Sequence, residues 1–353
     1  MIDNESKANC FHVRARAPLR IGLAGGGTDI KHYYEKYGGA ILNATIKRYA
    51  YAELVPIKSG FIAQSLDFQK SYNLNNTPSS QGKEVPKELT LHIAVYQRIM
   101  KTYNQGVNIC CQLSTYCDAP IGSGLGSSST LVVAMIKAFS ESLNLGLDDY
   151  TIAELAYQIE RIDCSLAGGK QDQYSATFGG FNYIEFTKES TIVNPLRIKN
   201  WFKCELESSL VLHFTGVSRH SAQVIDDQSK SIIEDNSKTI HYLDCIKHES
   251  TKMKASLLKC DRELFKDTLN KSWLLKSNTS KRISNSLIEE RIRYGFRNGA
   301  EAAKVSGAGG GGFILYFCQP SLAIELRNKL QALTNESFFC SFGDNGAEAW
   351  RIH

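Results

Sequence analysis

The amino-acid sequence predicts an α+β protein built from two domains. The chain has 353 residues, which is more than one hydrophobic core usually supports. Its first half alternates strand patterns with amphipathic helices, whereas long helices and a closing strand, helix and strand fill the second half. We therefore expect a first domain over residues 1–195 and a second over residues 196–353.

The composition is that of an ordinary globular protein. Hydrophobic residues make up 42% and charged residues 22% of the chain, which excludes disorder over its whole length. The net charge of +5 comes from 41 basic and 36 acidic side chains without a long single-sign block, so it does not suggest nucleic-acid binding. The ten cysteines show no CxxC pair and no Cys/His ligand spacing, which predicts reduced thiols and no structural zinc site.

Neither a signal peptide nor a membrane span can be recognised in the sequence. The N-terminal residues are polar, and no apolar run approaches the roughly 20 residues that a bilayer requires. We therefore expect a cytoplasmic protein without membrane partners. Its oligomeric state is open, and a homodimer is compatible with the sequence.

The first predicted elements are a strand, a glycine turn and a helix. Alternating apolar and basic residues predict a strand over residues 12–21. It leads into GLAGGGTDI, residues 22–30, and Thr28 is expected to cap a helix that runs to Tyr37. Residues 40–57 then predict a second strand.

A polar stretch separates these elements from the next helix and strand. Residues 68–88 are rich in Asn, Ser, Lys and Pro and predict a loop. The apolar face of the following helix carries Leu89, Ile93, Tyr96 and Met100. This helix is expected to end near Gly106, and residues 107–115 then predict a strand that leads into DAPIGSGLGSSS.

The rest of the chain is expected to be mainly helical. One helix is predicted over residues 128–143, and the next has a core face formed by Ile152, Leu155, Ile159 and Ile162. Residues 180–210 predict short strands, and residues 221–297 predict long helices. The chain closes with a helix-to-strand turn in AKVSGAGGGG, the strand FILYF, a helix over residues 322–333 and a terminal strand.

The segment GSGLGSSS, residues 122–129, is the first candidate for chemistry. Helix N-termini attract anions through free N–H groups and the helix dipole, and glycines let the backbone close around a phosphate. A serine hydroxyl there can reach a magnesium ion. A phosphate cradle and a plain helix-capping turn both fit this pattern. The cradle would consist of Gly122, Ser123, Gly124, Leu125, Gly126, Ser127, Ser128 and Ser129.

Two other nucleotide-binding loops do not fit the sequence. No GK[ST] follows the glycines, which excludes a Walker A loop, and Ser127 stands where a dinucleotide fingerprint has its third glycine. A GxGxxG does occur at Gly307, Gly309 and Gly312, but it precedes a strand instead of opening a helix. A NAD-dependent oxidoreductase is therefore not supported.

Three separated stretches resemble the three motifs of the GHMP kinases, which include galactokinase, homoserine kinase and mevalonate kinase. RAPLRIGLAGGGTD resembles the first motif, PIGSGLGSSST the second and KVSGAGGGGF the third, and together they span residues 16–313. The resemblance implies the two-domain GHMP kinase fold, with an antiparallel-rich sheet in a mixed α/β N-terminal domain and a ferredoxin-like C-terminal domain. It also implies ATP and Mg²⁺ as cofactors.

Within this family, the chain is most similar to bacterial D-glycero-D-manno-heptose 7-phosphate kinases. The shared segments are RAPLRI, GGGTD, GGKQDQY at residues 168–174 and TGVSRHS at residues 215–221. The similarity implies phosphorylation of the C1 hydroxyl of the heptose 7-phosphate, toward nucleotide-activated heptose for surface polysaccharide. A kinase for fucose, galactose or mannose, or an inactive sugar or nucleotide sensor on the same scaffold, stays open.

The resemblance also assigns roles to individual residues. Asp172 would be the catalytic base, and Arg20 would hold it ionised and offset charge on the migrating phosphoryl group. Ser128 and Glu160 would bind the magnesium ion. The implied contacts to the sugar phosphate are Gly26, Gly27, Thr28, Asp29, Lys170 and Arg219, with Lys31 as a further candidate. By the same resemblance, the third-motif glycines would pack against the phosphate cradle.

Overall fold

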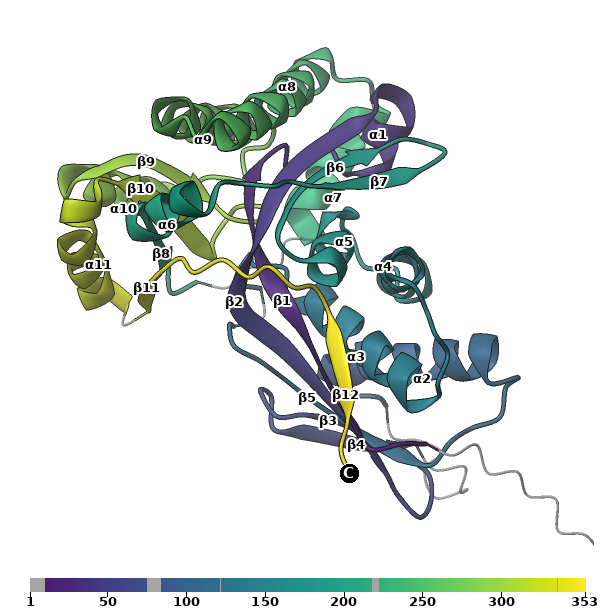
Figure 1. The fold of residues 1–353 in the computed structure, drawn as a ribbon. Helices are drawn as coiled ribbons and strands as arrows, with labels where there is room; N and C mark the ends of the chain where they lie inside the picture. Colours follow the sequence, from purple (N-terminus) through teal and green to yellow (C-terminus); the bar gives the residue numbers. More distant parts are fainter. Residues whose placement is uncertain (1–9, 75–83, 121, 218–221, 335) are drawn as a thin grey trace, which may run out of the picture.

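Two β-sheets and their flanking helices divide the chain into two lobes, as the computed structural model shows (Figure 1). The structure describes residues 10–74, 84–120, 122–217, 222–334 and 336–353. The strands of the larger sheet are β1 (Val13–Ala24), β2 (Gly39–Pro56), β3 (Phe61–Ser65), β4 (Lys70–Leu74), β5 (Cys111–Cys117), β6 (Phe181–Phe186), β7 (Thr191–Pro195) and β12 (Glu348–Arg351). The strands of the smaller sheet are β8 (Leu210–Phe214), β9 (Ala300–Val305), β10 (Phe313–Cys318) and β11 (Ser337–Phe339).

Helices cover both sheets. Those in the first half of the chain are α1 (Lys31–Tyr37), η2 (Lys87–Leu89), α2 (Thr90–Tyr103), α3 (Ser127–Ser142), α4 (Asp149–Gln158), η3 (Ile159–Asp163) and α5 (Gln171–Phe178). Those in the second half are α6 (Asn200–Ser209), α7 (Ala222–Ile233), α8 (Ser237–Lys259), α9 (Arg262–Ser277), α10 (Ser286–Arg297) and α11 (Pro320–Thr334).

The larger sheet is antiparallel except for one pair of strands. Its order is β12-β1-β2-β5-β3-β4, β6 pairs with the first part of β2, and β3 runs parallel to β5. The register between β1 and β2 shifts between Pro18 and Arg20, which marks a bulge beside Arg20. These pairings confirm the predicted antiparallel-rich sheet of a mixed α/β N-terminal part.

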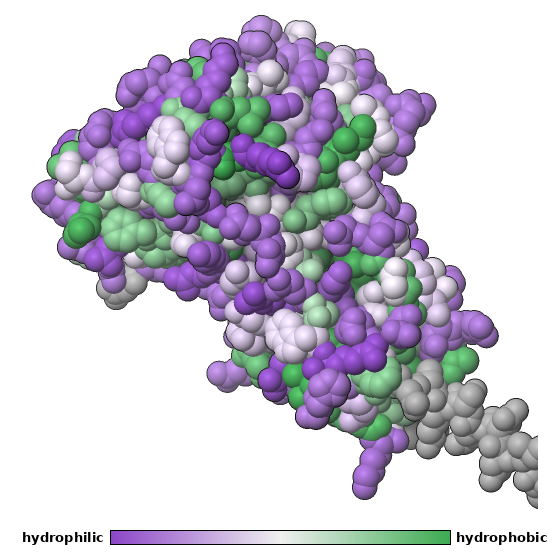
Figure 2. Space-filling model, viewed as in Figure 1, coloured by the Kyte–Doolittle hydropathy of each residue, from purple (hydrophilic) through white to green (hydrophobic). Residues whose placement is uncertain are grey.

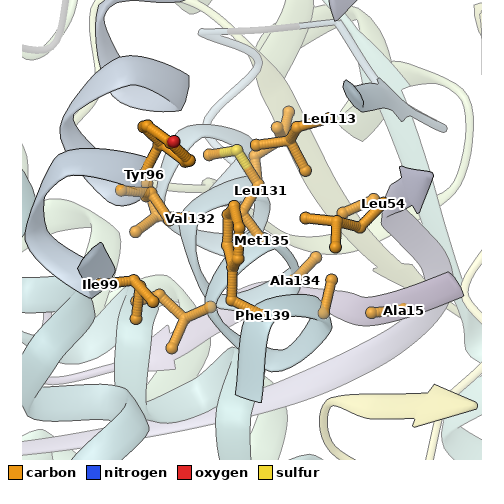
Figure 3. Packing of buried hydrophobic residues seen from close by; sticks show 14 of the residues in the cluster. Ala15, Leu54, Tyr96, Ile99, Leu113, Leu131, Val132, Ala134, Met135 and Phe139 are labelled. Atoms are coloured by element: carbon orange, nitrogen blue, oxygen red, sulfur yellow. The ribbon is translucent and has the colours of Figure 1, made fainter. Parts of the chain in front are cut away.

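Helices α2 and α3 bury the main core against β1, β2 and β5 (Figure 3). Figure 3 shows Met135 and Phe139 of α3 between Tyr96 of α2 and Leu54 of β2. Nearly every residue of α3 is buried, since the helix is covered by the sheet on one side and by other helices on the others. The N-terminus of this helix is thus held rigidly where the glycine segment delivers it.

The smaller sheet is ferredoxin-like, as predicted. Its order is β11-β8-β10-β9, and all its pairs are antiparallel. Helices α7 to α10 connect β8 to β9, a tight loop joins β9 to β10, and α11 connects β10 to β11. This β-α-β-β-α-β arrangement is the split βαβ pattern.

Several predicted elements are wrong in detail. AEAAKV before the third glycine loop is the strand β9 and not a helix, because pairing with β10 in a buried sheet overrides the helix propensity of Ala and Glu. Part of the predicted loop over residues 68–88 is strand β4, which pairs with β3. Strand β4 was not predicted. Ile162 is 59% exposed and not in a core face, because η3 is a π-helical turn that shifts the residues after Ile159 around the axis.

The C-terminal strand returns to the first sheet. The predicted boundary lies where β7 ends at Pro195, and β8 opens the smaller sheet shortly afterwards. However, β12 pairs with β1 over Val13–Arg16, and Figure 1 shows it beside β1 far from β11. Because the last strand belongs to the first sheet, a separate second domain over residues 196–353 stays a prediction.

Polar residues cover most of the face seen in Figure 2, and apolar residues form separate patches between them. Among the described residues, none of the helices combines the length and the apolar character that crossing a bilayer needs. The ten cysteines are all free thiols in the structure.

Candidate functional site

Three glycine-rich segments surround one cavity of about 310 Å³ between the two lobes. Its walls come from the turn after β1, the segment before α3, η3, the start of α5, helices α7 and α9, and the loop between β9 and β10. The volume is at the lower end of what small-molecule sites offer. Residues from all three sequence motifs thus meet at a single site.

The second glycine segment wraps around the N-terminus of α3. Gly122, Gly124 and Gly126 have φ angles of 79°, 82° and 81°, which favour glycine. Gly122, Gly124 and Gly126 line the cavity together with Ser127, Ser128 and Ser129. By contrast, Ser123 and Leu125 are buried and do not line it. The free N–H groups of the first turn of α3 therefore face a space where an anion can bind.

The third glycine loop locks onto the second. A Cβ on Gly124 would lie 2.5 Å from the carbonyl oxygen of Ser306, and one on Gly312 would lie 2.3 Å from that of Ser123. Ser306 Oγ donates to the Gly124 carbonyl at 3.0 Å, and Phe313 N donates to the Ser123 carbonyl at 2.9 Å. The second lobe thus positions the glycine segment before α3 in the first lobe, and the third-motif glycines pack against it, as the resemblance implied.

Arg20 and Asp172 form an ion pair at the wall of the cavity. Arg20 follows the bulge in β1 and is 2% exposed, and Asp172 is in the first turn of α5. Arg20 Nη2 lies 2.6 Å from Asp172 Oδ1, and Arg20 Nη1 donates to the Gly124 carbonyl at 2.6 Å. A Cβ on Gly126 would lie 3.4 Å from Asp172 Cγ, so the carboxylate lies next to the start of α3.

Ser128 and Glu160 also line the cavity and contact each other. Ser128 Oγ donates to Glu160 Oε1 at 3.1 Å, and the Gln173 amide donates to Oε2. The π-helical turn η3 directs Glu160 inward, where it is 1% exposed. Arg161 Nη1 lies 3.7 Å from the same carboxylate.

This pair of oxygen ligands fits a magnesium ion. The described part of the chain contains no cluster of three or more His, Cys, Asp or Glu side chains suited to a metal. Mg²⁺ usually takes one or two protein ligands and completes its shell with water and phosphate oxygens. A hydroxyl and a buried carboxylate beside a helix N-terminus are therefore a suitable donor set.

Asp29 is held in the turn after β1. Its Oδ1 accepts from Gly27 N and its Oδ2 from Gln171 N, both at 3.2 Å, and it lines the cavity with Gly27. Burial raises the pKa of Asp29 above its ordinary value of 3.8, and the nearby charge of Asp172 raises it further. An anionic side chain at this site would be favoured by hydroxyl donors of a bound ligand.

Thr28 does not cap the following helix. Its buried hydroxyl donates to the carbonyls of Gly25 and Ala40 and accepts from Ala40 N, and α1 begins only at Lys31. The Thr28 side chain therefore stabilises the turn through these hydrogen bonds, and it does not line the cavity. The Thr28 hydroxyl is therefore not accessible to a sugar, so the structure does not support the prediction of Thr28 as a sugar contact.

Two of the predicted phosphate-binding cations, Lys170 and Lys31, do not line the main cavity. Lys170 Nζ donates to Glu154 at 3.0 Å and lies 4.7 Å above the Tyr157 ring, and with Lys31 it lines a second cavity. Arg219 lies outside the described residues.

Gly26 follows Gly25 in the turn, and a Cβ on it would lie 3.1 Å from Lys276 Nζ.

The polar residues that line the cavity and that sequence reasoning missed include Arg161, Gln228 and Lys276. Arg161 directly follows Glu160, so the π-helical turn brings it in. Gln228 and Lys276 come from α7 and α9, whose amphipathic patterns carry no local sign of a site. Only the packing of these helices against the first lobe places them there.

Two family descriptions match the chain. The one for the GHMP kinases N terminal domain matches residues 90–180, and the one for the GHMP kinases C terminal matches residues 253–335. The first match contains the segment around α3 with Glu160 and Asp172, and the second contains the loop between β9 and β10.

Individual relatives extend the match to nearly the whole chain. The D-glycero-alpha-D-manno-heptose 7-phosphate kinase of Campylobacter jejuni is 42% identical over 96% of this chain and 99% of its own length. A crystal structure of a D-glycero-D-manno-heptose 1-phosphate kinase from Bacteroides thetaiotaomicron is 40% identical, with a TM-score of 0.79 over 97% of this chain and 99% of that one. The L-fucokinase/L-fucose-1-P guanylyltransferase of Bacteroides fragilis is 23% identical over 90% of this chain and 36% of that protein.

Proposed function

Because this chain belongs to the GHMP kinases and is a phosphotransferase with an alcohol acceptor, we propose that it phosphorylates the C1 hydroxyl of D-glycero-D-manno-heptose 7-phosphate with ATP. The product would be the 1,7-bisphosphate, a precursor of nucleotide-activated heptose for surface polysaccharide. Identity of 42% with the Campylobacter jejuni enzyme supports this acceptor. The observation that carries the chemistry is the Arg20–Asp172 pair beside the N-terminus of α3.

Asp172 acts as the base in this proposal. Its carboxylate accepts the proton of the acceptor hydroxyl as the bond to phosphorus forms. An anomeric hydroxyl is more acidic than the other hydroxyls of a sugar, so a carboxylate is a sufficient base. Arg20 stays protonated, holds the carboxylate in position through Oδ1, and offsets negative charge nearby.

The segment from Gly122 to Ser129 holds the phosphates of ATP. Backbone N–H groups at the start of α3 donate to phosphate oxygens, and Gly126 lets them approach closely. Ser128 and Glu160 would hold Mg²⁺, which supplies charge neutralisation on the phosphates when it is bound. Gln173 keeps the Glu160 carboxylate oriented through its second oxygen.

Asp29, Gly26 and Gly27 are the proposed sugar contacts. The Asp29 carboxylate is fixed by two backbone N–H groups and can accept from two neighbouring hydroxyls. The far phosphate of the heptose needs cations, and Arg219 and Lys170 stay predictions for that role. Lys170 is engaged by Glu154, so it would have to leave this partner to reach a phosphate.

A kinase for a neutral sugar is the second candidate. The likeness to the L-fucokinase of Bacteroides fragilis favours it, and a neutral acceptor needs no cation at its far end. An Arg219→Ala variant with unchanged KM for the heptose phosphate would favour this candidate, whereas a KM raised about tenfold would support the heptose phosphate. An inactive sensor is disfavoured, since the cavity retains Asp172, Arg20, Glu160 and Ser128.

The position of the new phosphate needs a direct test. The names of two relatives place the phosphate of the substrate at different carbons, C7 in one and C1 in the other. We would incubate the protein with MgATP and heptose 7-phosphate and assign the product by phosphorus NMR. A new phosphate coupled to the anomeric proton is expected, and transfer to any other hydroxyl would contradict the proposal.

A further inference from the structure

Lys276 reaches the cavity from helix α9, outside all three glycine-rich motifs. It lies in the last turn of α9 and is 5% exposed. Its Nζ donates to the carbonyl of Gly307, and a Cβ on Gly26 would lie 3.1 Å from it. Gly307 in turn packs against Gly124, where a Cβ on Gly307 would lie 2.7 Å from the Gly124 Cα. The ammonium group thus lies between the proposed sugar turn and the proposed phosphate loop.

The ammonium group of Lys276 has hydrogen-bonding capacity that the described residues do not use. A protonated lysine carries three N–H donors, and the Gly307 carbonyl is the one acceptor that the described part of the chain provides. No described carboxylate forms an ion pair with it. Burying an ammonium group whose donors lack acceptors is costly, so this site favours an anion that supplies the missing acceptors.

The neighbouring charged groups are already engaged elsewhere. Asp172 is paired with Arg20, and Asp29 accepts from two backbone N–H groups. Lys304 of β9 donates to the Gly22 carbonyl and does not line the cavity. Burial lowers the pKa of Lys276 to about 8, because the opposing effects of Asp29 and Asp172 do not compensate for it. An additional anion in the cavity would stabilise the protonated form.

We infer that Lys276 donates to a non-bridging oxygen of the phosphoryl group while this group passes from ATP to the acceptor. This inference rests on the proposed function, because it places ATP and sugar on the two sides of Lys276. In the transfer, the acceptor oxygen forms a bond to phosphorus, the bond between phosphorus and the ADP oxygen breaks, and Asp172 takes the hydroxyl proton. Lys276 keeps its own proton and offsets the charge on the phosphoryl oxygens.

Two variants separate this role from that of an anchor for the third glycine loop. Lys276→Gln loses the charge but can still donate to the Gly307 carbonyl. Lys276→Met loses both the charge and the donor. Both are expected to lower kcat about 100-fold while the KM for ATP changes less than about threefold. Lys271→Met is the matched control, since Lys271 is exposed on the same helix and lies outside the cavity. Near-normal kcat of the Gln variant would overturn the inference.

A binding measurement tests the inference without turnover. ADP, Mg²⁺ and aluminium fluoride together mimic the phosphoryl group in transfer, and calorimetry reports how much aluminium fluoride tightens ADP binding. Lys276→Gln is expected to bind ADP like the unchanged protein but to lose most of this tightening. Equal tightening in both proteins would contradict the inference. Failure of the unchanged protein to phosphorylate any sugar would instead refute the proposed function, and Lys276 would still be judged by aluminium fluoride binding.

Discussion

Arg20 Nε and Nη2 lie 2.8 and 2.6 Å from the same oxygen of Asp172, Oδ1. The two residues are 152 positions apart in the chain, and the bulge in β1 and the first turn of α5 bring them together. The other carboxylate oxygen, Oδ2, lies toward Gly126, where a Cβ would be 3.5 Å away. One oxygen is thus used for positioning, and the other faces the start of α3.

Replacing Asp172 by Asn should abolish turnover but not ATP binding. The amide keeps the size of the side chain and can accept from Arg20, but it cannot take a proton. We expect kcat to fall at least about 1,000-fold, because the variant loses both the base and the negative charge beside Arg20. Single-turnover kinetics and ADP calorimetry would measure the two effects separately.

Asp163→Asn is the matched control for this variant. Asp163 also pairs with an arginine, Arg98, but this pair is partly exposed and lies outside the cavity. Its loss should leave kcat unchanged and cost at most about 1 kcal/mol of stability. A similar loss of activity in both variants would indicate damage to the fold and not to the base.

Removing the carboxylate of Glu160 should raise the magnesium requirement. Glu160→Gln retains the hydrogen bond from Ser128 but weakens the ligand for a divalent cation. We expect the Mg²⁺ concentration for half-maximal activity to rise about tenfold at fixed ATP. Glu141→Gln, which affects a pair with Arg351 away from the cavity, should behave like the unchanged protein. Identical Mg²⁺ titrations of all three proteins would exclude Glu160 as a ligand.

The affinity for the sugar should fall at acidic pH through Asp29. Because burial raises the pKa of Asp29, its carboxylate is protonated at a higher pH than that of an exposed aspartate. The ionised form is therefore present above the raised pKa and is lost as the pH falls through it. The nearby charge of Asp172 adds to the upward shift of the Asp29 pKa. We expect the sugar KM to rise toward low pH at saturating ATP.

In Asp29→Asn, the sugar KM should be about tenfold higher near neutral pH and less dependent on pH, since hydrogen bonds to a charged group contribute roughly 1.5–3 kcal/mol. Asp67→Asn is the control, because burial also raises the pKa of Asp67, which lies outside the cavity. A steep acidic limb that persists in Asp29→Asn would assign the titration to another group.

The contact between the two glycine loops can be tested with a pair of alanine variants. Gly124 and Gly106 have similar φ angles of 82° and 77°, so alanine costs about 1 kcal/mol at each for the left-handed backbone. Only at Gly124 would the new Cβ meet the Ser306 carbonyl, at 2.5 Å, whereas it would meet nothing within 4 Å at Gly106. Gly124→Ala should therefore lose at least about 1 kcal/mol more in thermal unfolding and bind ATP more weakly. Equal effects at both positions would argue against the locked loops.

The glycine motifs could be predicted from the sequence because their function depends on backbone geometry that few other residues adopt. Gly122, Gly124 and Gly126 all have positive φ, and the helix after them contains the apolar run LVVAMI, residues 131–136. Such features are local, so they are visible in a single sequence. The same is true of the strand over Val13–Ala24, whose start alternates between buried and exposed residues.

Features that depend on tertiary packing could not be predicted. Glu301 and its alanine neighbours favour a helix, yet pairing with β10 and burial make β9 a strand. Lys276 has the sequence context of an ordinary surface lysine near a helix end, and only the contacts of α9 with β1 and β9 bring it into the cavity. Thr28 looked like a helix cap, but the close approach of Ala40 to the glycine turn takes up its hydroxyl.

The most direct test of the account is the specificity of the unchanged protein for its acceptor. ADP formation would be followed with MgATP and heptose 7-phosphate, heptose 1-phosphate, fucose, galactose, mannose or no sugar, each over a range of concentrations. We expect kcat/KM for D-glycero-D-manno-heptose 7-phosphate to exceed that for every other acceptor at least about 100-fold, since an acceptor without the C7 phosphate loses the charge-assisted hydrogen bonds proposed for it. Equal or faster turnover of a neutral sugar or of the 1-phosphate would contradict the proposed acceptor.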